Sequence, residues 1–274
     1  MTQRIQATSL IRRTAVGSAT LLAAGLLLAG CGVVDREPSP SPSPPADPKE
    51  ALLAAVPDET TPAFRFSGAE PDGTALSGFV DPTGKGMELV VAMSEGEGEG
   101  EGELSVVMSF WVIDQDTWLK VDFGDTPELH DLLGVEPEQW VELDQSKLTD
   151  DSLTYDLADV GNTGVIIEAA DDVQLHADGS YTGTVDLTDE PKAAEVLVDG
   201  DITALGDAAA SIPFTAMIGA DGNLETLSVD VPASDEQPAG EYLVKYFDYS
   251  EVPAITPPAG NVVPAPAKVY ELLG

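Results

Sequence analysis

The chain has 274 residues and carries 12 Lys and Arg against 49 Asp and Glu, a formal net charge of −37. So few cations argue against nucleic-acid binding, which depends on Lys and Arg releasing counterions from phosphates, and against adhesion to anionic lipid through a basic surface. The apolar content of 43% is too high for an acidic disordered chain, and the single Cys excludes a disulfide framework and a multi-Cys zinc site.

Residues 1–30 have the features of a secretory signal peptide. Arg4, Arg12 and Arg13 precede an apolar run over residues 15–30, which is shorter than the roughly 20 residues that a membrane span needs. The residues around the arginine pair match the twin-arginine export pattern poorly, so ordinary secretion is favoured over twin-arginine export.

The apolar run ends in Leu28-Ala29-Gly30-Cys31, which matches the bacterial lipobox. In a lipobox, a diacylglyceryl group is attached to the Cys thiol and cleavage leaves that Cys as the new, N-acylated N-terminus, often with palmitate. The alternative is a plain signal peptide that happens to contain a Cys. Since two acyl chains suffice for stable anchoring, we expect Cys31 to tether the mature chain to the outer face of the plasma membrane. No other cofactor is expected.

A Pro/Ser-rich spacer follows Cys31 and extends to residue 46. Alternating Ser and Pro favours extended polyproline II, so the fifteen residues from 32 to 46 span roughly 45 Å. A partner-binding PxxP motif is a less favoured interpretation of this segment. No second linker and no internal repeat follows, so residues 47–274 are expected to form a single domain.

Within this domain the sequence predicts several short helices and about ten strands. Asp47-Pro48-Lys49-Glu50 has the pattern of a helix start, and predicts a helix over residues 49–55. Asp178-Gly179 and Asp221-Gly222 are hairpin signals between alternating segments. Strands are expected at 64–67, 75–80, 87–93, 104–113, 117–123, 140–143, 181–187, 214–218 and 227–231, and a further strand that includes His176 is expected before the Asp178-Gly179 turn. Further helices are expected at 127–133, 163–170, 191–198 and 267–273. This succession predicts an α+β fold with one large antiparallel sheet.

The strands at 87–93 and 104–113 are apolar on both faces. A strand of this kind must be covered on both sides, by helices on one and by a second sheet or a curved sheet around an apolar cavity on the other. All four methionines of the mature chain, Met87, Met93, Met108 and Met217, fall in predicted strands. Met is common at adaptable apolar surfaces, although the same residues could fill an ordinary core. The candidate cavity wall consists of Met87, Met93, Met108, Phe110 and Trp111.

The lipobox, the spacer and the sheet-rich domain occur together with a set of short motifs. These are Trp140, Asp144-Gln145-Ser146-Lys147-Leu148, residues 181–188 (YTGTVDLT), residues 213–216 (PFTA), residues 221–224 (DGNL), residues 246–249 (YFDY) and residues 257–259 (PPA). In this combination the chain resembles the actinobacterial LppX/LprG-type lipoproteins, which share a LolA-like fold. The resemblance implies a strongly curved antiparallel half-barrel, with short helices on its concave side, enclosing an apolar cavity for acyl chains. The run of alternating Glu and Gly at residues 95–103 departs from the family pattern.

No residue pattern predicts catalysis or a metal site. His130 and His176 lack a second His or Cys at ligand spacing, and no nucleophile-elbow, zinc-protease, Walker or dinucleotide motif is present. The Glu-Gly run could gather Ca²⁺ loosely, but a solvated loop is the favoured interpretation.

The leading hypothesis is a non-enzymatic, monomeric, membrane-anchored lipoprotein that binds acyl chains of a lipid or glycolipid. The alternative is a protein-interaction or sensor module of the cell envelope with a filled core, and an envelope hydrolase is least supported. A protein partner cannot be named from the sequence.

Overall fold

The computed structural model describes residues 47–95, 104–124, 126, 128–148, 155, 158–198, 200–234, 237–252 and 254–273. Cys31, the spacer and residues 96–103 of the Glu-Gly run therefore lie outside the described residues.

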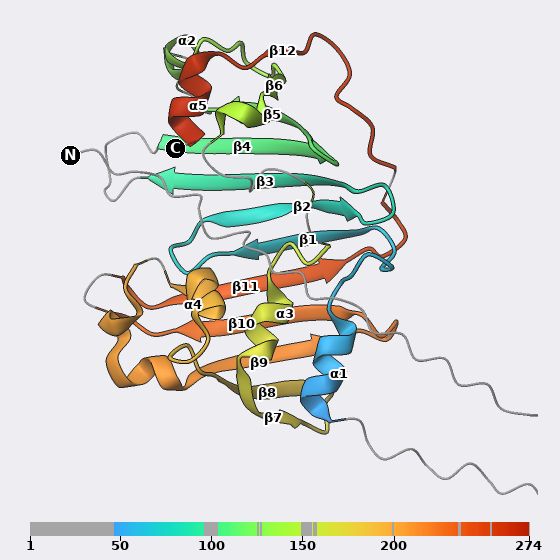
Figure 1. Ribbon diagram of the computed structural model, residues 1–274, viewed down its shortest axis with the longest axis vertical. Helices are drawn as coiled ribbons and strands as arrows, with labels where there is room; N and C mark the ends of the chain where they lie inside the picture. Colours follow the sequence, from blue (N-terminus) through green and yellow to red (C-terminus); the bar gives the residue numbers. More distant parts are fainter. Residues whose placement is uncertain are drawn as a thin grey trace, which may run out of the picture.

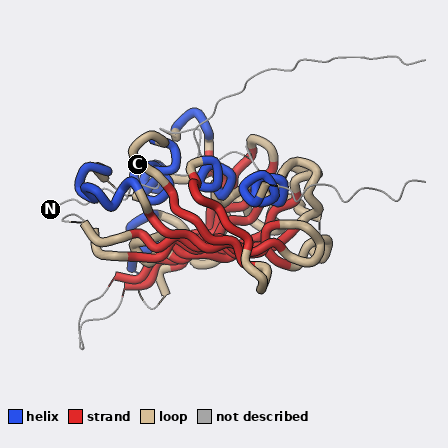
Figure 2. The backbone as a smooth tube through the Cα atoms, turned by 90° about the horizontal axis from the view of Figure 1, so that it is seen from below, coloured by secondary structure: helices blue, strands red, loops and turns tan. Residues whose placement is uncertain are grey.

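Twelve strands form one curved sheet that does not close into a barrel (Figures 1 and 2). Neighbouring strands are antiparallel except β12, which is parallel to β6, and the edges of the sheet are β12 and β7. The strand order is β12-β6-β5-β4-β3-β2-β1-β11-β10-β9-β8-β7. The strands are β1 (Phe64–Ala69), β2 (Ala75–Asp81), β3 (Gly86–Glu95), β4 (Leu104–Ile113), β5 (Asp116–Asp122), β6 (Val141–Leu143), β7 (Ala170–Leu175), β8 (Ser180–Val185), β9 (Ile212–Ile218), β10 (Leu224–Val231), β11 (Gly240–Phe247) and β12 (Val263–Pro264).

The sheet consists of two meanders joined at one seam. Strands β1 to β6 follow one another in space as they do in the chain, and so do β7 to β11. The seam is the antiparallel pairing of β1 with β11, in which Phe66 lies opposite Tyr246. The predicted α+β class with one large antiparallel sheet is confirmed.

The short helices lie on one face of this sheet, which we call the helix face (Figure 2). In Figure 1, α1 (Pro48–Ala55), α3 (Thr163–Glu168) and α4 (Pro191–Leu197) lie over the β7–β11 half, while α2 (Glu128–Leu133) and α5 (Ala267–Leu273) lie at the β5–β6 end. Two 3₁₀ segments, η1 (Gln145–Lys147) and η3 (Ile202–Ala210), complete the described elements with helical geometry.

Helix α1 begins as its sequence predicts and is tied to the edge of the sheet. The Asp47 side chain accepts hydrogen bonds from the backbone N–H groups of Lys49 and Glu50 at 2.9 and 3.4 Å, which satisfies donors that a helix start leaves free. The Lys49 ammonium donates to the carbonyl oxygens of Glu168 and Ala170 at 2.8 and 2.7 Å. This side chain therefore links α1 to the end of α3 and the start of the edge strand β7.

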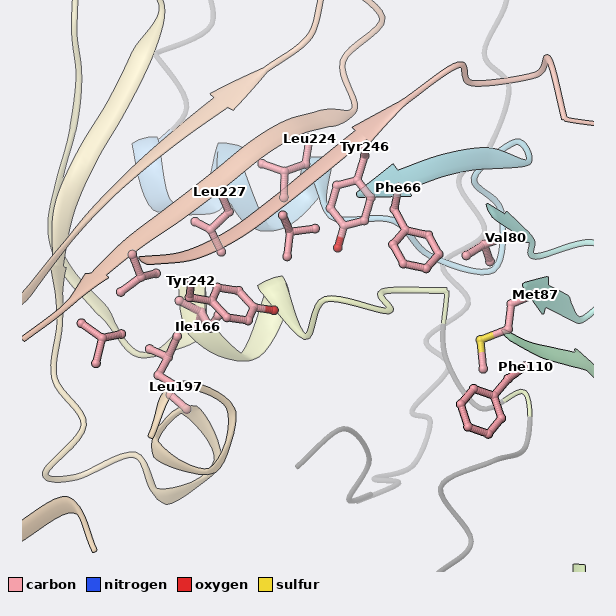
Figure 3. Packing of buried hydrophobic residues seen from close by; sticks show 14 of the residues in the cluster. Phe66, Val80, Met87, Phe110, Ile166, Leu197, Leu224, Leu227, Tyr242 and Tyr246 are labelled. Atoms are coloured by element: carbon pink, nitrogen blue, oxygen red, sulfur yellow. The ribbon is translucent and has the colours of Figure 1, made fainter. Parts of the chain in front are cut away.

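The principal core fills the space between the helices and the β7–β11 half. Leu52 of α1, Ile166 of α3 and Leu197 of α4 are at most 1% exposed, and they belong to one cluster with Leu227 of β10 and Tyr246 of β11 (Figure 3). Alternating apolar residues along these strands place one side of each strand in this core, as period-two patterns predict.

A buried carboxyl group attaches the start of α3 to β11. The Asp159 carboxyl accepts hydrogen bonds from the Tyr246 hydroxyl, the Thr163 hydroxyl and the backbone N–H of Gly164, each at 2.8 Å. The nearby Tyr242 hydroxyl donates to the carbonyl oxygen of Gly161. Burial raises the pKa of the Asp159 carboxyl above its ordinary value, although the three hydrogen bonds act in the opposite direction.

This raised pKa predicts a pH-dependent difference between the wild-type chain and Asp159→Asn. The protonated carboxyl favours the folded state, and this contribution is complete below the unfolded-state pKa of about 3.9 and is lost as the pH rises through the folded-state pKa. The free energy of unfolding of the wild type should therefore fall relative to that of Asp159→Asn as the pH rises through this window. Urea unfolding of both chains over a series of pH values measures the difference.

Asp201 provides a control of opposite sign. Its exposed carboxylate accepts a hydrogen bond from the backbone N–H of Thr203 at 2.9 Å, which lowers its pKa. The wild type should lose stability relative to Asp201→Asn as the pH falls through that lowered pKa. Parallel pH profiles for the wild type and Asp159→Asn would contradict the ionisation of a buried carboxyl at this position.

Candidate functional site

Four of the five candidate wall residues lie together on the helix face of β3 and β4. The register pairs Met87 with Val112, Leu89 with Phe110, Val91 with Met108 and Met93 with Val106, so one face of this hairpin is apolar throughout. Met87, Met108 and Phe110 are 4–7% exposed, whereas Met93 is half-buried. We call this surface the methionine face; it consists of Met87, Leu89, Val91, Met93, Val106, Met108 and Phe110.

The described helices lie to either side of β3, although Met87, Met108 and Phe110 on the methionine face are themselves buried. In Figure 1, helices α1, α3 and α4 lie over the other half of the sheet, α2 and α5 lie at its β5–β6 end, and none of the helices in the described part of the chain lies over β2 and β3. The methionine face is nevertheless continuous with the principal core, because Met87, Met108 and Phe110 belong to the same cluster as Leu52 and Tyr246. The apolar interior thus extends beyond the part of the sheet that these helices cover.

Trp111 corrects the predicted set, because its side chain lies on the opposite face of β4. It pairs with Glu88 of β3 and Trp118 of β5, whereas the side chains of its neighbours Phe110 and Val112 lie on the helix face. Side chains alternate strictly between the two faces of a strand, so Trp111 cannot line one cavity together with Met108. Its indole Nε1 is buried without a hydrogen-bond partner.

On this opposite face, Trp111 belongs to an aromatic cluster that was not predicted from the sequence. The rings of Phe79 and Trp111 meet edge to face with centroids 5.6 Å apart, and those of Trp111 and Trp140 do so at 6.0 Å. The guanidinium of Arg65 lies 5.8 Å from the centre of the Phe79 ring, and the ammonium of Lys120 lies 5.4 Å from that of Trp140. These geometries are typical of aromatic pairs and cation–π contacts.

The tryptophan cluster, which we define as Phe79, Trp111, Trp118 and Trp140, contains every tryptophan of the chain. Phe79 and Trp118 are only 7% and 8% exposed, yet they do not belong to the principal core. The domain therefore has a second, smaller apolar cluster on the face that the helices leave open.

Glu88 lies in this second cluster at a half-buried position. Burial raises the pKa of its carboxyl, while the positive charges of Lys120 and Arg65 act in the opposite direction. The Glu88 carboxyl is thus influenced by two nearby cations and lies opposite Trp111 in the strand pairing.

The two histidines lie in different parts of the fold, His130 in α2 and His176 directly after β7. His130 is 6% exposed with its ring 5.1 Å from that of Phe123, and its Nδ1 has no hydrogen-bond partner. His176 shares a 2.7 Å hydrogen bond with the hydroxyl of Thr182. Among the described residues there is no group of three or more His, Cys, Asp and Glu that could hold a metal ion.

No helix among the residues that the structure describes combines the length and the apolar character needed to cross a membrane.

Comparison with known proteins adds no assignment to these observations. No family model matches the chain, and no curated protein matches it significantly.

The different surroundings of two methionines predict different effects on stability. Met108 is 5% exposed on the methionine face, whereas Met217 of β9 is 41% exposed on the other face. Met108→Ala should lower the free energy of unfolding by about 2–5 kcal/mol, and Met217→Ala should change it by less than about 0.5 kcal/mol. Urea unfolding followed by circular dichroism tests both. Equal effects of the two substitutions would contradict the assignment of the faces.

Proposed function

We propose that this protein is a membrane-anchored lipoprotein that holds acyl chains of a lipid or glycolipid against the methionine face. The observation that supports this proposal is the extension of the apolar interior across β3 and β4, beyond the described helices. Flexible Met side chains and aliphatic side chains suit an acyl chain, which needs apolar contact without directional bonds. The resemblance to the LppX/LprG-type lipoproteins leads to the same function.

The energy of such binding comes from desolvation. Removing a chain from water stabilises it by about 0.8 kcal/mol for each CH₂ group, so a chain of about 14 carbons gains on the order of 10 kcal/mol before the costs of ordering are subtracted. A bilayer offers a similar gain, and the transfer of a chain between the bilayer and the protein is then close to balanced. This balance is what a carrier or presenter of lipids requires.

Anchoring through Cys31 fits the charge of the chain. Without residues 1–30 the chain has nine Lys and Arg against 49 Asp and Glu, a net charge of −40. Anionic lipid repels such a surface, which makes covalent acyl chains a physically sensible means of attachment to the bilayer. The spacer then gives the domain reach to approach lipids in the same membrane.

Two substitutions in β3 distinguish the methionine face from the opposite face. Val91 pairs with Met108 on the methionine face and its neighbour Val90 pairs with Ser109 on the other, and both valines are half-buried. Val91→Phe should weaken binding of a dansyl-labelled undecanoic acid about tenfold, equivalent to about 1.4 kcal/mol, because the larger side chain occupies space that the chain needs. Val90→Phe should leave binding unchanged. Titration followed by the fluorescence of the dansyl group, excited directly, measures the affinity of each variant.

Equal affinities for the wild type and both variants, or no binding to the wild type, would contradict an acyl-binding site on this face. The second result would favour the alternative, a protein-interaction module of the cell envelope with a filled core.

The anchor is tested separately through Cys31. Because the thiol is the attachment point of the diacylglyceryl group, Cys31→Ser should move the protein from the membrane fraction to the soluble fraction. Fractionation followed by immunoblotting measures the distribution. A Cys31→Ser protein that stayed in the membrane fraction would show that the anchor has been assigned to the wrong residue.

A further inference from the structure

On the face opposite to the helices, the strand register places side chains in three parallel rows that cross β11 and β1 to β5. The first is an aromatic row with charged residues between its rings: Phe247, Arg65, Phe79, Glu88, Trp111 and Trp118. Directly opposed residues in adjacent strands touch, so this row is continuous. Phe79 and Trp118 are buried within it, Arg65, Glu88 and Trp111 are half-buried, and Phe247 is exposed.

The other two rows consist mostly of small side chains. The second row is Lys245, Ser67, Ser77, Val90, Ser109 and Lys120. The third row is Leu243, Ala69, Ala75, Ala92, Val107 and Asp122. Ser77 and Ala75 are exposed, and the remaining serines and alanines are half-buried. Side by side, these two rows form a strip of mostly small side chains, which we call the serine–alanine strip. The aromatic row borders it along one side.

Two cations of the first and second rows have both an acidic and an aromatic neighbour. Lys120 makes a 3.0 Å ion pair with Glu138 while lying over the Trp140 ring. Arg65 lies 3.7 Å from the carboxylate of Asp248 while lying over the Phe79 ring. Side chains that are already ordered lose little entropy when a ligand binds to them.

We propose that this strip and its aromatic border bind an uncharged polysaccharide chain. The C–H groups of a sugar ring pack against aromatic rings such as Trp111 and Trp140, and its hydroxyl groups pair with serine hydroxyls and with charged side chains such as Lys120 and Glu88. Adjacent strands lie about 4.8 Å apart, so the strip from β11 to β5 is roughly 24 Å long and accommodates several sugar units in a row.

The charges favour an uncharged ligand. Arg65 and Lys120 are balanced by Asp248 and Glu138, and the mature chain has a net charge of −40. A polyanion would be repelled by the net negative charge of the whole molecule, which the one further cation of these rows, Lys245, does not offset.

The test compares Ser77→Arg with Thr215→Arg in native electrophoresis through gels that contain dextran, mannan or hydroxyethyl cellulose. Ser77 lies exposed in the middle of the strip, and Thr215 lies exposed on the same face of the sheet in β9, away from it. At least one polymer should retard the wild type and Thr215→Arg, while Ser77→Arg should bind it about tenfold more weakly because its side chain covers the strip. Binding should also change the tryptophan emission, since every tryptophan lies in the cluster.

Circular dichroism and thermal unfolding of both variants confirm that the fold is retained. No retardation of the wild type by any of the three polymers, or equal retardation of the two variants, would overturn the proposal. So would stronger retardation by the polyanion polygalacturonate than by each neutral polymer. The outcome of this test is independent of the acyl-binding function, because Ser77 lies on the face opposite to the methionine face. The Ser77→Arg protein should therefore bind dansyl-undecanoic acid as the wild type does.

Discussion

The antiparallel pairing of β1 with β11 is the interaction on which the rest of this structure depends. Without it, β1–β6 and β7–β11 would be separate meanders, each with its own edges. With it, Phe66 and Tyr246 lie side by side and one face of the sheet becomes a continuous apolar surface, while Arg65 and Phe247 continue the aromatic row on the other. The seam also brings Tyr242 and Tyr246 of β11 to the segment that begins α3, where Asp159 fixes it.

The two faces of the β2–β5 region differ in chemistry, and this difference separates the two proposed binding functions. On the helix face, aliphatic and methionine side chains offer a surface without directional bonds. On the other face, aromatic rings, hydroxyl groups and paired charges offer stacking and hydrogen bonds in fixed positions. One strand such as β4 supplies both surfaces, because Met108 and Phe110 point to one side and Ser109 and Trp111 to the other. An acyl chain and a sugar chain could therefore be held at the same time, back to back.

Much of the fold could be predicted from the sequence, because its strands alternate clearly and its turns have characteristic residues. The strand over residues 104–113 and the helix over 267–273 have the predicted bounds, and both Asp-Gly turns join paired strands. The helix expected over 163–170 ends earlier, at Glu168, because β7 begins at Ala170. The strand expected before the Asp178-Gly179 turn is present as β7, but it ends at Leu175, one residue before His176. Its bounds could not be predicted, since an edge strand with Asp171, a left-handed Asp172 and a shift in register does not alternate.

The candidate site could be predicted only in part. The double-sided apolar pattern of β3 and β4 identified the methionine face, since strand period is a local property of the sequence. The tryptophan cluster was missed because Phe79, Trp111 and Trp118 meet through register across β2 to β5, and no single segment encodes that alignment. The strand β11, which lies in the middle of the sheet, was also missed, although Tyr242, Val244 and Tyr246 alternate with Leu243 and Lys245.

Native mass spectrometry of the intact anchored chain, before and after extraction with organic solvent, tests the central claim most directly. A bound lipid should give a species heavier than the covalently modified chain by the mass of that lipid. Organic solvent should remove this extra mass and release a molecule with acyl chains. A chain that has the same mass before and after extraction, with only its covalent modification, would contradict the claim that the methionine face holds a lipid.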